Sequence, residues 1–307
     1  MPETSNPQTS NPERGVRDLV SAVATIEGEG FEVRRAFPTP RVEAPDPFLL
    51  LDHVGPREMA PGEARGAPDH PHRGFETVTY VLSGETEHED SVGNRGILGA
   101  GDVQWMTAGA GVVHSEMPSE RIRREGGLVH FLQLWVNLPA ADKMAPPRYQ
   151  EVSAGAIPVV AIASGISARV IAGTVAGATG PVETHSPFQY VHLSVAGAAP
   201  PVRLPVPADH EVFTYVMTGE VSVGSDAHVA PAGTLVRFSP AEAGAAETSL
   251  REVVIAGGTD DGDAIVVSGR PLREPVARYG PFVMNTRQQL VEAVEDFRAG
   301  RMGRIPR

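Results

Sequence analysis

The chain has 307 residues, of which 41% are hydrophobic, so it is long enough for two domains that each have a core. Its net charge of −12 argues against a protein that binds the phosphate backbone of nucleic acids. The charge is compatible with binding to another protein that is itself bound to DNA. The absence of cysteine excludes disulfides and thiolate metal ligands and favours a reducing compartment, so we expect a cytoplasmic protein.

The first 14 residues are rich in Pro, Asn, Thr and Ser and lack the apolar stretch of a signal peptide, so we predict a disordered tail over residues 1–14. No apolar run reaches the roughly 18 residues of a membrane span, and we expect no membrane association. The 33 glycines and 28 prolines favour short strands and turns over long helices.

Short strand-like stretches follow one another through the first half of the chain. Residues 31–37 alternate in hydrophobicity and residues 48–54 form an apolar run, so both are predicted strands. A turn-rich passage over residues 55–69 leads to the next group of strands. We predict these at residues 70–82, 86–91, 103–106, 112–116 and 128–138. Strands this short, separated by turns, indicate an all-β sandwich or barrel.

An internal repeat indicates that this architecture is duplicated. Residues 75–85 read FETVTYVLSGE and residues 210–220 read HEVFTYVMTGE, which aligns Tyr80 with Tyr215. We therefore predict an N-terminal domain over residues 15–148 and a related domain over residues 149–284.

The last segment, residues 285–307, has a different pattern. Thr286 and Gln289 have the spacing of a capping box, and Gly300 stands where a helix would end. Apolar residues between them fall at helical spacing: Leu290, Val294 and Phe297. We predict one short C-terminal helix that packs a narrow apolar stripe on a β domain.

Two pairs of ligand-type side chains stand in the N-terminal domain, His70 with His72 and His114 with Glu116. Residues two apart on a strand point to the same face, so two antiparallel strands could bring three imidazoles and one carboxylate together. This set suits a divalent first-row metal. We expect Fe(II), while softness and geometry also permit Mn, Ni, Cu or Zn. Four protein ligands leave up to two open positions on an octahedral ion, as a catalytic site requires.

The remaining polar and aromatic residues that invite a functional interpretation are better explained structurally. We interpret the other histidines as satisfied or exposed side chains: His53, His88, His130, His185, His192, His210 and His228. Trp105 and Trp135 are predicted to be core residues, and residues 121–124 a solvated basic loop.

The motifs of the first half resemble those of the pirin family, a group of bicupins within the cupin superfamily. They are HPHRGFETV from His70, GDVQWMTAG from Gly101, HSE from His114 and, near the end, GPFVMNT from Gly280. The resemblance covers nearly the whole chain beyond the tail and is weaker over residues 151–256. It implies two tandem cupin barrels (jelly-roll or double-stranded β-helix folds), with iron in the N-terminal one and an empty C-terminal one.

The second repeat lacks the histidine pair, because His70 and His72 align with Pro205 and Pro207. The same four-ligand site can therefore not form there.

The resemblance leaves open which of two carboxylates is the fourth metal ligand. In the general cupin pattern the carboxylate ligand follows the two histidines, which is Glu76 here; in pirins it lies two residues after the last histidine, which is Glu116. The loop before His114 is two residues longer than the general cupin pattern and lacks its proline, which favours Glu116. We predict His70, His72, His114 and Glu116 as metal ligands, with Glu76 outside them, orienting an imidazole.

Pirins are associated with quercetin 2,3-dioxygenase chemistry and, in animals, with iron-dependent co-regulation of transcription in the nucleus. Our first hypothesis is an oxygenase that takes dioxygen and a flavonol or another enolisable or catecholic aromatic substrate. Glu116 would be its catalytic base, and the small-residue loop over residues 108–111 would admit the flat substrate. A second hypothesis is a redox-responsive binding protein with a protein partner, and a third is a sugar or keto-acid isomerase. We expect a monomer.

Overall fold

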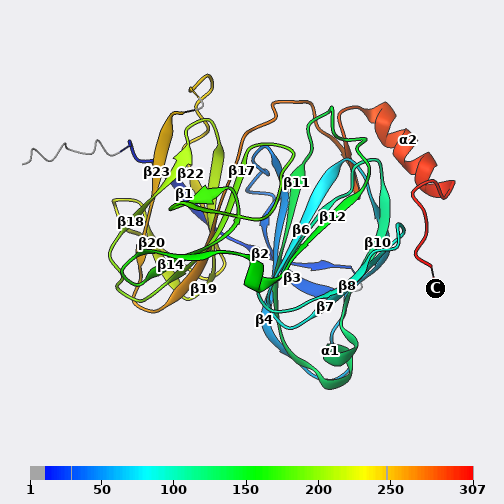
Figure 1. Cartoon of the computed structure of the whole chain (residues 1–307), viewed down its shortest axis with the longest axis horizontal. Helices are drawn as coiled ribbons and strands as arrows, with labels where there is room; N and C mark the ends of the chain where they lie inside the picture. Colours follow the sequence, from blue (N-terminus) through cyan, green and yellow to red (C-terminus); the bar gives the residue numbers. More distant parts are fainter. Residues whose placement is uncertain (1–10, 29, 247, 307) are drawn as a thin grey trace, which may run out of the picture.

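A computed structural model describes residues 11–28, 30–246 and 248–306, and it shows two β barrels side by side, with a C-terminal helix at the far end of the first one (Figure 1). Each barrel consists of a seven-stranded and a four-stranded sheet, and the strands in all four sheets pair antiparallel. The predicted all-β fold with two cupin barrels is therefore confirmed.

The first barrel is formed by eleven strands in two sheets. Its larger sheet has the order β12 (Arg148–Val152), β9 (Val103–Thr107), β6 (Phe75–Ser83), β11 (Gly127–Asn137), β4 (Phe48–Met59), β3 (Phe31–Phe37) and β2 (Val23–Glu27). Its smaller sheet has the order β5 (Ala67–His72), β10 (Val112–Pro118), β7 (Thr86–Asp90) and β8 (Arg95–Leu98).

The second barrel repeats this arrangement. Its larger sheet has the order β1 (Val16–Ser21), β22 (Thr234–Phe238), β19 (Glu211–Thr218), β24 (Gly262–Gly269), β17 (Phe188–Val195), β14 (Ile166–Ala172) and β13 (Val159–Ala163). Its smaller sheet has the order β18 (Val202–Pro207), β23 (Leu250–Gly257), β20 (Glu220–Val223) and β21 (His228–Pro231).

The remaining elements are short. Two hairpins lie outside the four sheets, β15 (Thr174–Val175) with β16 (Ala178–Thr179) and β25 (Ala277–Tyr279) with β26 (Phe282–Met284). The helical elements are α1 (Glu120–Glu125), the 3-10 turn η1 (Ala154–Ala156) and α2 (Arg287–Arg298). None of the helices in the described residues is long and apolar enough to cross a membrane.

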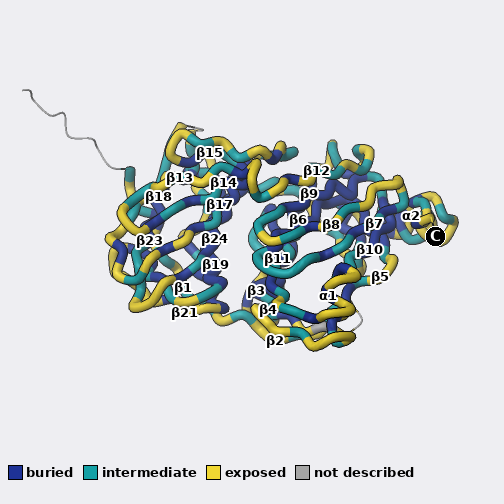
Figure 2. The backbone as a smooth tube through the Cα atoms, turned by 60° about the horizontal axis from the view of Figure 1, so that its bottom comes forward, coloured by how far each residue is buried: buried dark blue, intermediate teal, exposed yellow. Residues whose placement is uncertain are grey.

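The two barrels exchange their terminal segments. β1 pairs with β22 at the edge of the second barrel, in the position that β12 occupies in the first barrel. Residues 16–21 therefore lie in the second barrel, although the predicted N-terminal domain begins at residue 15. In return, β26 and α2 pack against the first barrel, where both views place α2 beside β10 (Figures 1 and 2).

Helix α2 has the predicted ends. The Thr286 hydroxyl accepts a hydrogen bond from the Gln289 backbone N–H, and the Gln289 side chain accepts one from the Thr286 backbone N–H, so the capping box is confirmed. Leu290 and Ala293 are buried against β26, while Phe297 remains 40% exposed.

Three local predictions were wrong. The stretch predicted as one strand over residues 70–82 is divided near Gly74 into β5 and β6, which lie in different sheets. β4 continues to Met59 instead of ending at Val54, because a bulge in its pairing with β11 lets the strand pass Gly55 and Pro56. The basic stretch over residues 121–124 lies in helix α1 instead of a loop, since the Ser119 hydroxyl caps the helix by accepting from the Ile122 N–H. Its arginines are exposed, as expected.

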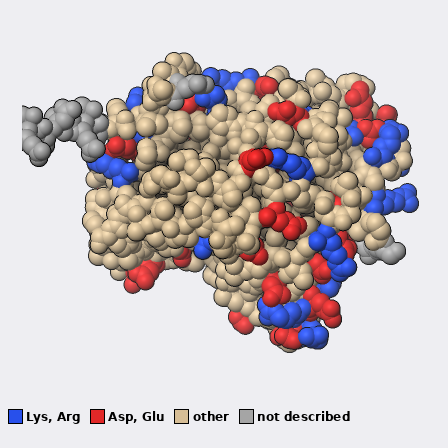
Figure 3. Space-filling view, in the orientation of Figure 1, with Lys and Arg blue, Asp and Glu red and all other residues tan. Residues whose placement is uncertain are grey.

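Charged side chains are unevenly distributed over the molecule. In the view of Figure 3, acidic and basic residues gather around α1, at the lower end of the first barrel, while the face of the second barrel is mostly uncharged. The two signs are intermixed around α1, through ion pairs such as Arg121 with Glu85 and Arg95 with Glu87. This face offers no continuous basic surface of the kind that a nucleic acid would need.

The barrels are joined by an apolar interface between their larger sheets. Aromatic rings cross it edge to face, with ring centroids 4.9 Å apart for Phe48 and Phe213 and 5.3 Å apart for Trp105 and Phe188. Such edge-to-face pairs add stabilisation to that of the buried area. The interface makes the two barrels share one hydrophobic core.

Two tyrosine–histidine hydrogen bonds cross the same interface and are related by the internal repeat. Tyr80 of the first barrel bonds His192 Nδ1 of the second at 2.7 Å, and Tyr215 of the second bonds His53 Nδ1 of the first at 3.0 Å. His53 Nε2 then lies 2.7 Å from Nε2 of His130. The interpretation of these histidines as satisfied side chains is confirmed, and three of the four tyrosine and histidine side chains in these bonds are buried.

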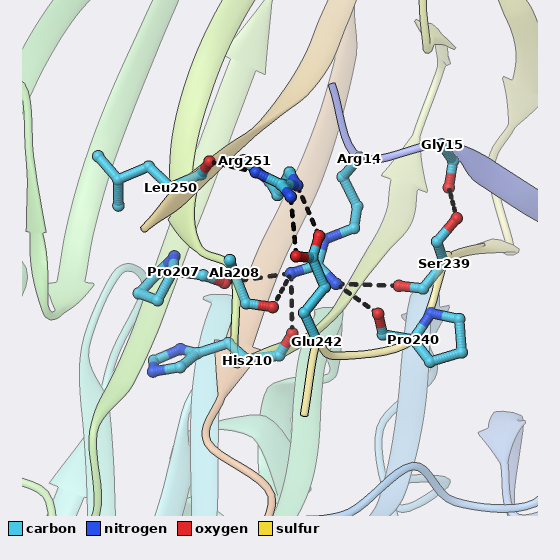
Figure 4. Close-up of polar contacts among 10 residues, drawn as sticks. All are labelled: Arg14, Gly15, Pro207, Ala208, His210, Ser239, Pro240, Glu242, Leu250 and Arg251. Carbon is cyan, nitrogen blue, oxygen red and sulfur yellow. Dashed lines mark hydrogen bonds and ion pairs between the residues drawn. The ribbon is translucent and has the colours of Figure 1, made fainter. Parts of the chain in front are cut away.

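The first residues of the described chain are tied to the second barrel. Residues 1–10 lie outside the described residues, but Arg14 is only 2% exposed, so the predicted disordered tail does not extend to residue 14. Its guanidinium donates to five backbone carbonyls at distances of 2.8–3.2 Å (Figure 4). The carbonyls are those of Pro207, Ala208, His210, Ser239 and Pro240.

We predict that Arg14→Ala destabilises the protein by about 3 kcal/mol, because it removes charge-assisted hydrogen bonds and leaves carbonyls without a donor. The free energy of unfolding in urea measures the effect. Arg17→Ala is the control, since Arg17 is exposed and should change the stability by less than about 0.5 kcal/mol. Equal stability of the two variants would contradict the role of Arg14.

The interface histidines also predict how stability depends on pH. Burial, followed by the charge of Arg34, lowers the pKa of His53 to about 2 and that of His130 to about 4, from an ordinary value of 6.5. Below pH 6.5 the unfolded chain binds protons that the folded protein does not, so stability is lost as the pH falls. Between pH 7 and 5 we expect a loss of about 2 kcal/mol for each histidine.

Urea titrations at the two pH values measure this loss. The double variant His53→Gln/His130→Gln should lose less stability than the wild type on acidification. His228→Gln removes an exposed imidazole and should keep the wild-type pH dependence. An unchanged dependence in the double variant would show that the loss arises elsewhere.

Candidate metal centre

The two strands that carry the histidine pairs are adjacent in the smaller sheet of the first barrel. β5 and β10 pair antiparallel, with His70 opposite His114 and His72 opposite Val112. The predicted pairing of the ligand strands is therefore confirmed, and the two-residue alternation of each strand turns the three imidazoles to one face.

Three imidazoles converge at this point. One ring nitrogen of each of His70, His72 and His114 lies within 4.8 Å of the others. The ring centroids of His70 and His114 are 4.3 Å apart, and those of His72 and His114 are 4.9 Å apart. Nitrogen ligands at about 2.1 Å from one ion lie roughly 3–4 Å from each other, so small side-chain rotations bring all three to a common ion.

The hydrogen bonding of the imidazoles fits a metal. His70 Nδ1 lies 2.7 Å from the Pro68 carbonyl, which fixes the proton on Nδ1 and leaves Nε2 free as a ligand. His72 Nδ1 and both ring nitrogens of His114 are buried without any hydrogen-bond partner among the described residues. Unpartnered buried nitrogens are costly, and a metal bond would satisfy them.

Burial keeps the imidazoles in the form that binds metals. It lowers the pKa of His72 and His114 well below the ordinary value, and the neighbouring His70 acts in the same direction. Both rings are therefore neutral at physiological pH, with a lone pair available for a cation.

Glu116, the predicted fourth ligand, lies on β10 but not in the imidazole group. Its carboxylate accepts a hydrogen bond of 2.8 Å from the Thr79 hydroxyl and bonds of 3.1 and 3.0 Å from the Gln133 amide. A bulge between β5 and β10 falls between His114 and Glu116, and it shifts the register just after the histidine. Ligation by Glu116 stays a prediction.

Glu76 is directed away from the three imidazoles. Its buried carboxylate accepts a hydrogen bond of 2.7 Å from Thr107 and lies 4.0 Å from His185 Nε2. Gly74, with φ of 85°, interrupts the alternation between His72 and Glu76, so the side chains of these two residues do not share a face although their numbers are both even. The contacts of Glu76 thus give no support to the predicted role of orienting an imidazole of this group.

Two of the imidazoles, those of His70 and His72, open onto a cavity of about 800 Å³. His70, His72 and Glu116 line it, together with apolar side chains such as Val33, Leu50 and Phe131. Cavities of this size accommodate a drug-sized molecule.

Trp135 lies in the cavity wall instead of the core. Its ring centroid is 5.1 Å from that of His72, and the Arg278 guanidinium carbon lies 5.0 Å from the Trp135 ring. The core assignment is correct for Trp105, which is fully buried, but wrong for Trp135. The alternation of β11 could have shown this, because Trp135 shares the face of Gln133.

The small-residue loop before His114 has a different role from the one we expected. A side chain at Gly109 would approach the Ala145 carbonyl oxygen to 2.0 Å, and one at Gly111 would meet Met302 at 2.8 Å. The backbone of the loop packs closely against these residues and does not line the cavity, so the prediction that it admits the substrate has no support in the structure.

The second barrel is filled differently at the equivalent place. Pro205 and Pro207 lie on β18, the counterpart of β5. Leu204 and Val206, which alternate with them, are buried in an apolar cluster with Val253 and Ile255. The interior that holds imidazoles in the first barrel is occupied by aliphatic side chains in the second.

Comparison with known proteins relates both halves of the chain to one family. The family described as Pirin matches residues 30–136, and its partner, described as Pirin C-terminal cupin domain, matches residues 190–303. A Pseudomonas aeruginosa protein whose name proposes quercetin 2,3-dioxygenase activity is 42% identical over 278 residues, covering 89% of this chain and 93% of its own. A pirin-like protein of tomato, Solanum lycopersicum, is 39% identical over 289 residues, covering 92% of this chain and 91% of its own.

A solved structure shows the same likeness. The crystal structure of quercetin 2,3-dioxygenase from Acinetobacter baumannii superposes with a TM-score of 0.87 at 38% identity, covering 96% of this chain and all of that one.

We predict that His114→Ala lowers the affinity for divalent metals by more than about 100-fold, because it removes the most buried of the three imidazoles. Metal content after purification and competition with a chelator measure the effect. His228→Ala, which removes an exposed imidazole, is the control and should bind metal like the wild type. Full metal binding by His114→Ala would exclude this site.

Proposed function

We propose that this chain, which belongs to the pirin family of two-barrel cupin proteins, is an oxygenase of the quercetin 2,3-dioxygenase type. Its substrate would be a flavonol or a related enolisable or catecholic aromatic compound, with dioxygen as the second reactant. The observation that supports the proposal best is the group of three imidazoles, two of them buried with unpartnered nitrogens, next to a cavity large enough for such a molecule.

The donor set suits a redox-active metal. A divalent first-row metal held by His70, His72 and His114, which we propose to be Fe(II), supplies a Lewis-acidic and redox-active centre for the substrate oxygen and dioxygen. Glu116 completes the ligand set in this proposal. The bonds from Thr79 and Gln133 use three of the roughly four acceptor positions of its carboxylate, which leaves one for a cation or a proton.

Glu116 is also the proposed proton acceptor, a role that its one remaining acceptor position allows when the carboxylate leaves the metal. It faces the cavity beside His70 and His72, where the acidic hydroxyl of a flavonol would lie against the imidazoles. Transfer of that proton to the carboxylate breaks the substrate O–H bond and leaves an enolate, the electron-rich form that reacts with dioxygen.

An aromatic ring in the cavity wall suits a flat substrate. Trp135 lines the cavity and packs on the fully buried Phe75, with ring centroids 4.6 Å apart, and both rings contact His72. The Trp135 ring is therefore the surface against which the aromatic rings of the substrate would pack.

The test begins with iron-loaded protein and quercetin without oxygen, followed by addition of oxygen. We expect oxygen uptake with release of carbon monoxide. Glu116→Gln should lower kcat/KM by about 100-fold or more, because the amide cannot accept the proton. Glu125→Gln, an exposed side chain on α1, is the matched control and should keep wild-type turnover.

No turnover with quercetin and several other flavonols would contradict the oxygenase. The redox-responsive binding protein that we also considered differs in a measurable way, since its partner binding would change with the oxidation state of the iron in the absence of turnover.

A further inference from the structure

We propose that residues 281–305 position the metal centre, and that the ion pair between Arg73 and Asp296 determines how tightly the protein holds its metal. The inference rests on the proposed function only in assuming that the three imidazoles bind a metal. These residues follow the second barrel in the sequence, but they lie behind the ligand strands of the first.

The first contact joins this segment to the end of β5. Directly after His72, the Arg73 N–H donates to the Pro281 carbonyl at 3.4 Å, and the Val283 N–H donates to the Arg73 carbonyl at 3.0 Å. The backbone that carries His72 thus continues as a short parallel bridge with β26.

The Arg73 side chain connects this point with the other ligand strand. Its Nε donates to the Ala110 carbonyl at 2.6 Å, in the loop that leads to His114, and its Nη2 lies 2.7 Å from Asp296 Oδ2 on α2. Arg73 is only 5% exposed, so these bonds are little weakened by solvent. One guanidinium therefore fixes the residue after His72, the loop before His114 and α2 relative to one another.

Asp296 is itself held in place. It accepts a hydrogen bond of 2.5 Å from Arg301 Nε, so one carboxylate binds both the arginine beside the ligands and the arginine just beyond α2. Its loss would free the Arg73 guanidinium on one side while leaving all three imidazoles intact.

A second group of contacts holds β10. The Ser91 hydroxyl donates to the Met302 carbonyl at 2.8 Å and accepts from the N–H of Val113, the neighbour of His114, at 3.1 Å. The Met302 side chain leaves no room for a side chain at Gly111.

A buried lysine adds a third connection. Lys143 is 1% exposed, and its Nζ donates to the carbonyls of Gly74 at 2.7 Å and Val283 at 3.0 Å and to the Asn137 side chain at 2.6 Å. It therefore joins the glycine after the ligand strand to the same C-terminal segment.

These contacts converge on residues within one to four positions of His72 and His114. Groups that orient metal ligands typically change metal affinity by 10–100-fold when they are removed, because the ligands then sample geometries that do not bind. The bonds of Arg73 fix the backbone on both sides of the imidazole group, so we infer that they act in this way.

The test uses the full chain with three substitutions on α2. Asp296→Asn removes the charge that binds Arg73, Asp296→Glu keeps it, and Glu295→Gln removes the charge of the exposed neighbouring residue. The measurements are Co(II) affinity by chelator competition, the ligand-field absorption spectrum of bound Co(II), and the melting temperature of the metal-free protein.

We expect Asp296→Asn to bind Co(II) about tenfold more weakly and to shift its absorption bands, with recovery in Asp296→Glu and no change in Glu295→Gln. A changed melting temperature with an unchanged affinity and spectrum would show a purely structural ion pair and overturn the inference. The inference would also be overturned if Glu295→Gln weakened Co(II) binding as much as Asp296→Asn does, or if the wild type bound no Co(II). If these effects on Co(II) binding are found but no flavonol is turned over, the proposed oxygenase activity is contradicted and the inference about residues 281–305 is not.

Discussion

The close approach of three imidazoles, two of them buried, is the constraint on which the rest of the structure depends. His114 is fully buried, has no hydrogen-bond partner among the described residues for either ring nitrogen, and lies next to both His70 and His72. Without a cation this arrangement carries a cost that an apolar core would avoid. The pairing of β5 with β10, the glycine-rich loop before His114 and the segment packed behind both strands all serve to hold the three rings together.

The second barrel has kept the architecture and lost the polar interior. Where β5 presents histidines, β18 presents prolines on one face and buried aliphatic residues on the other. Its contribution to the site is indirect, since it shares a core with the first barrel and binds it through Tyr80–His192 and Tyr215–His53. The internal repeat thus contains one barrel with imidazoles in its interior and one whose interior is aliphatic at the equivalent place.

The sequence predicted the features that depend on local pattern. The two-residue spacing of the histidines, the repeat and the capping box of α2 all follow from strand and helix geometry, and each has the predicted form. Features that depend on distant contacts were missed. Arg14 looked like part of a polar tail because its carbonyl partners lie about two hundred residues away.

The errors at the site have a similar origin. Glu76 was expected to orient an imidazole, but a single residue with positive φ, Gly74, resets the alternation between His72 and Glu76. Trp135 was placed in the core although the alternation of β11 puts it on the same face as the polar Gln133, which lines the cavity. The contribution of α2 could not be predicted, since no local pattern indicates which barrel a terminal helix will contact.

The exchange of terminal segments has a consequence for how the chain is made. On the ribosome, β1 emerges first but has no partner until β22 has been synthesised, and the first barrel lacks the backing of its ligand strands until Met302 appears. The imidazoles of the first barrel are translated early, yet the segment that packs behind their strands follows only after the whole second barrel. A protein cut between the barrels would therefore yield two incomplete halves, each exposing a surface that the other half normally covers.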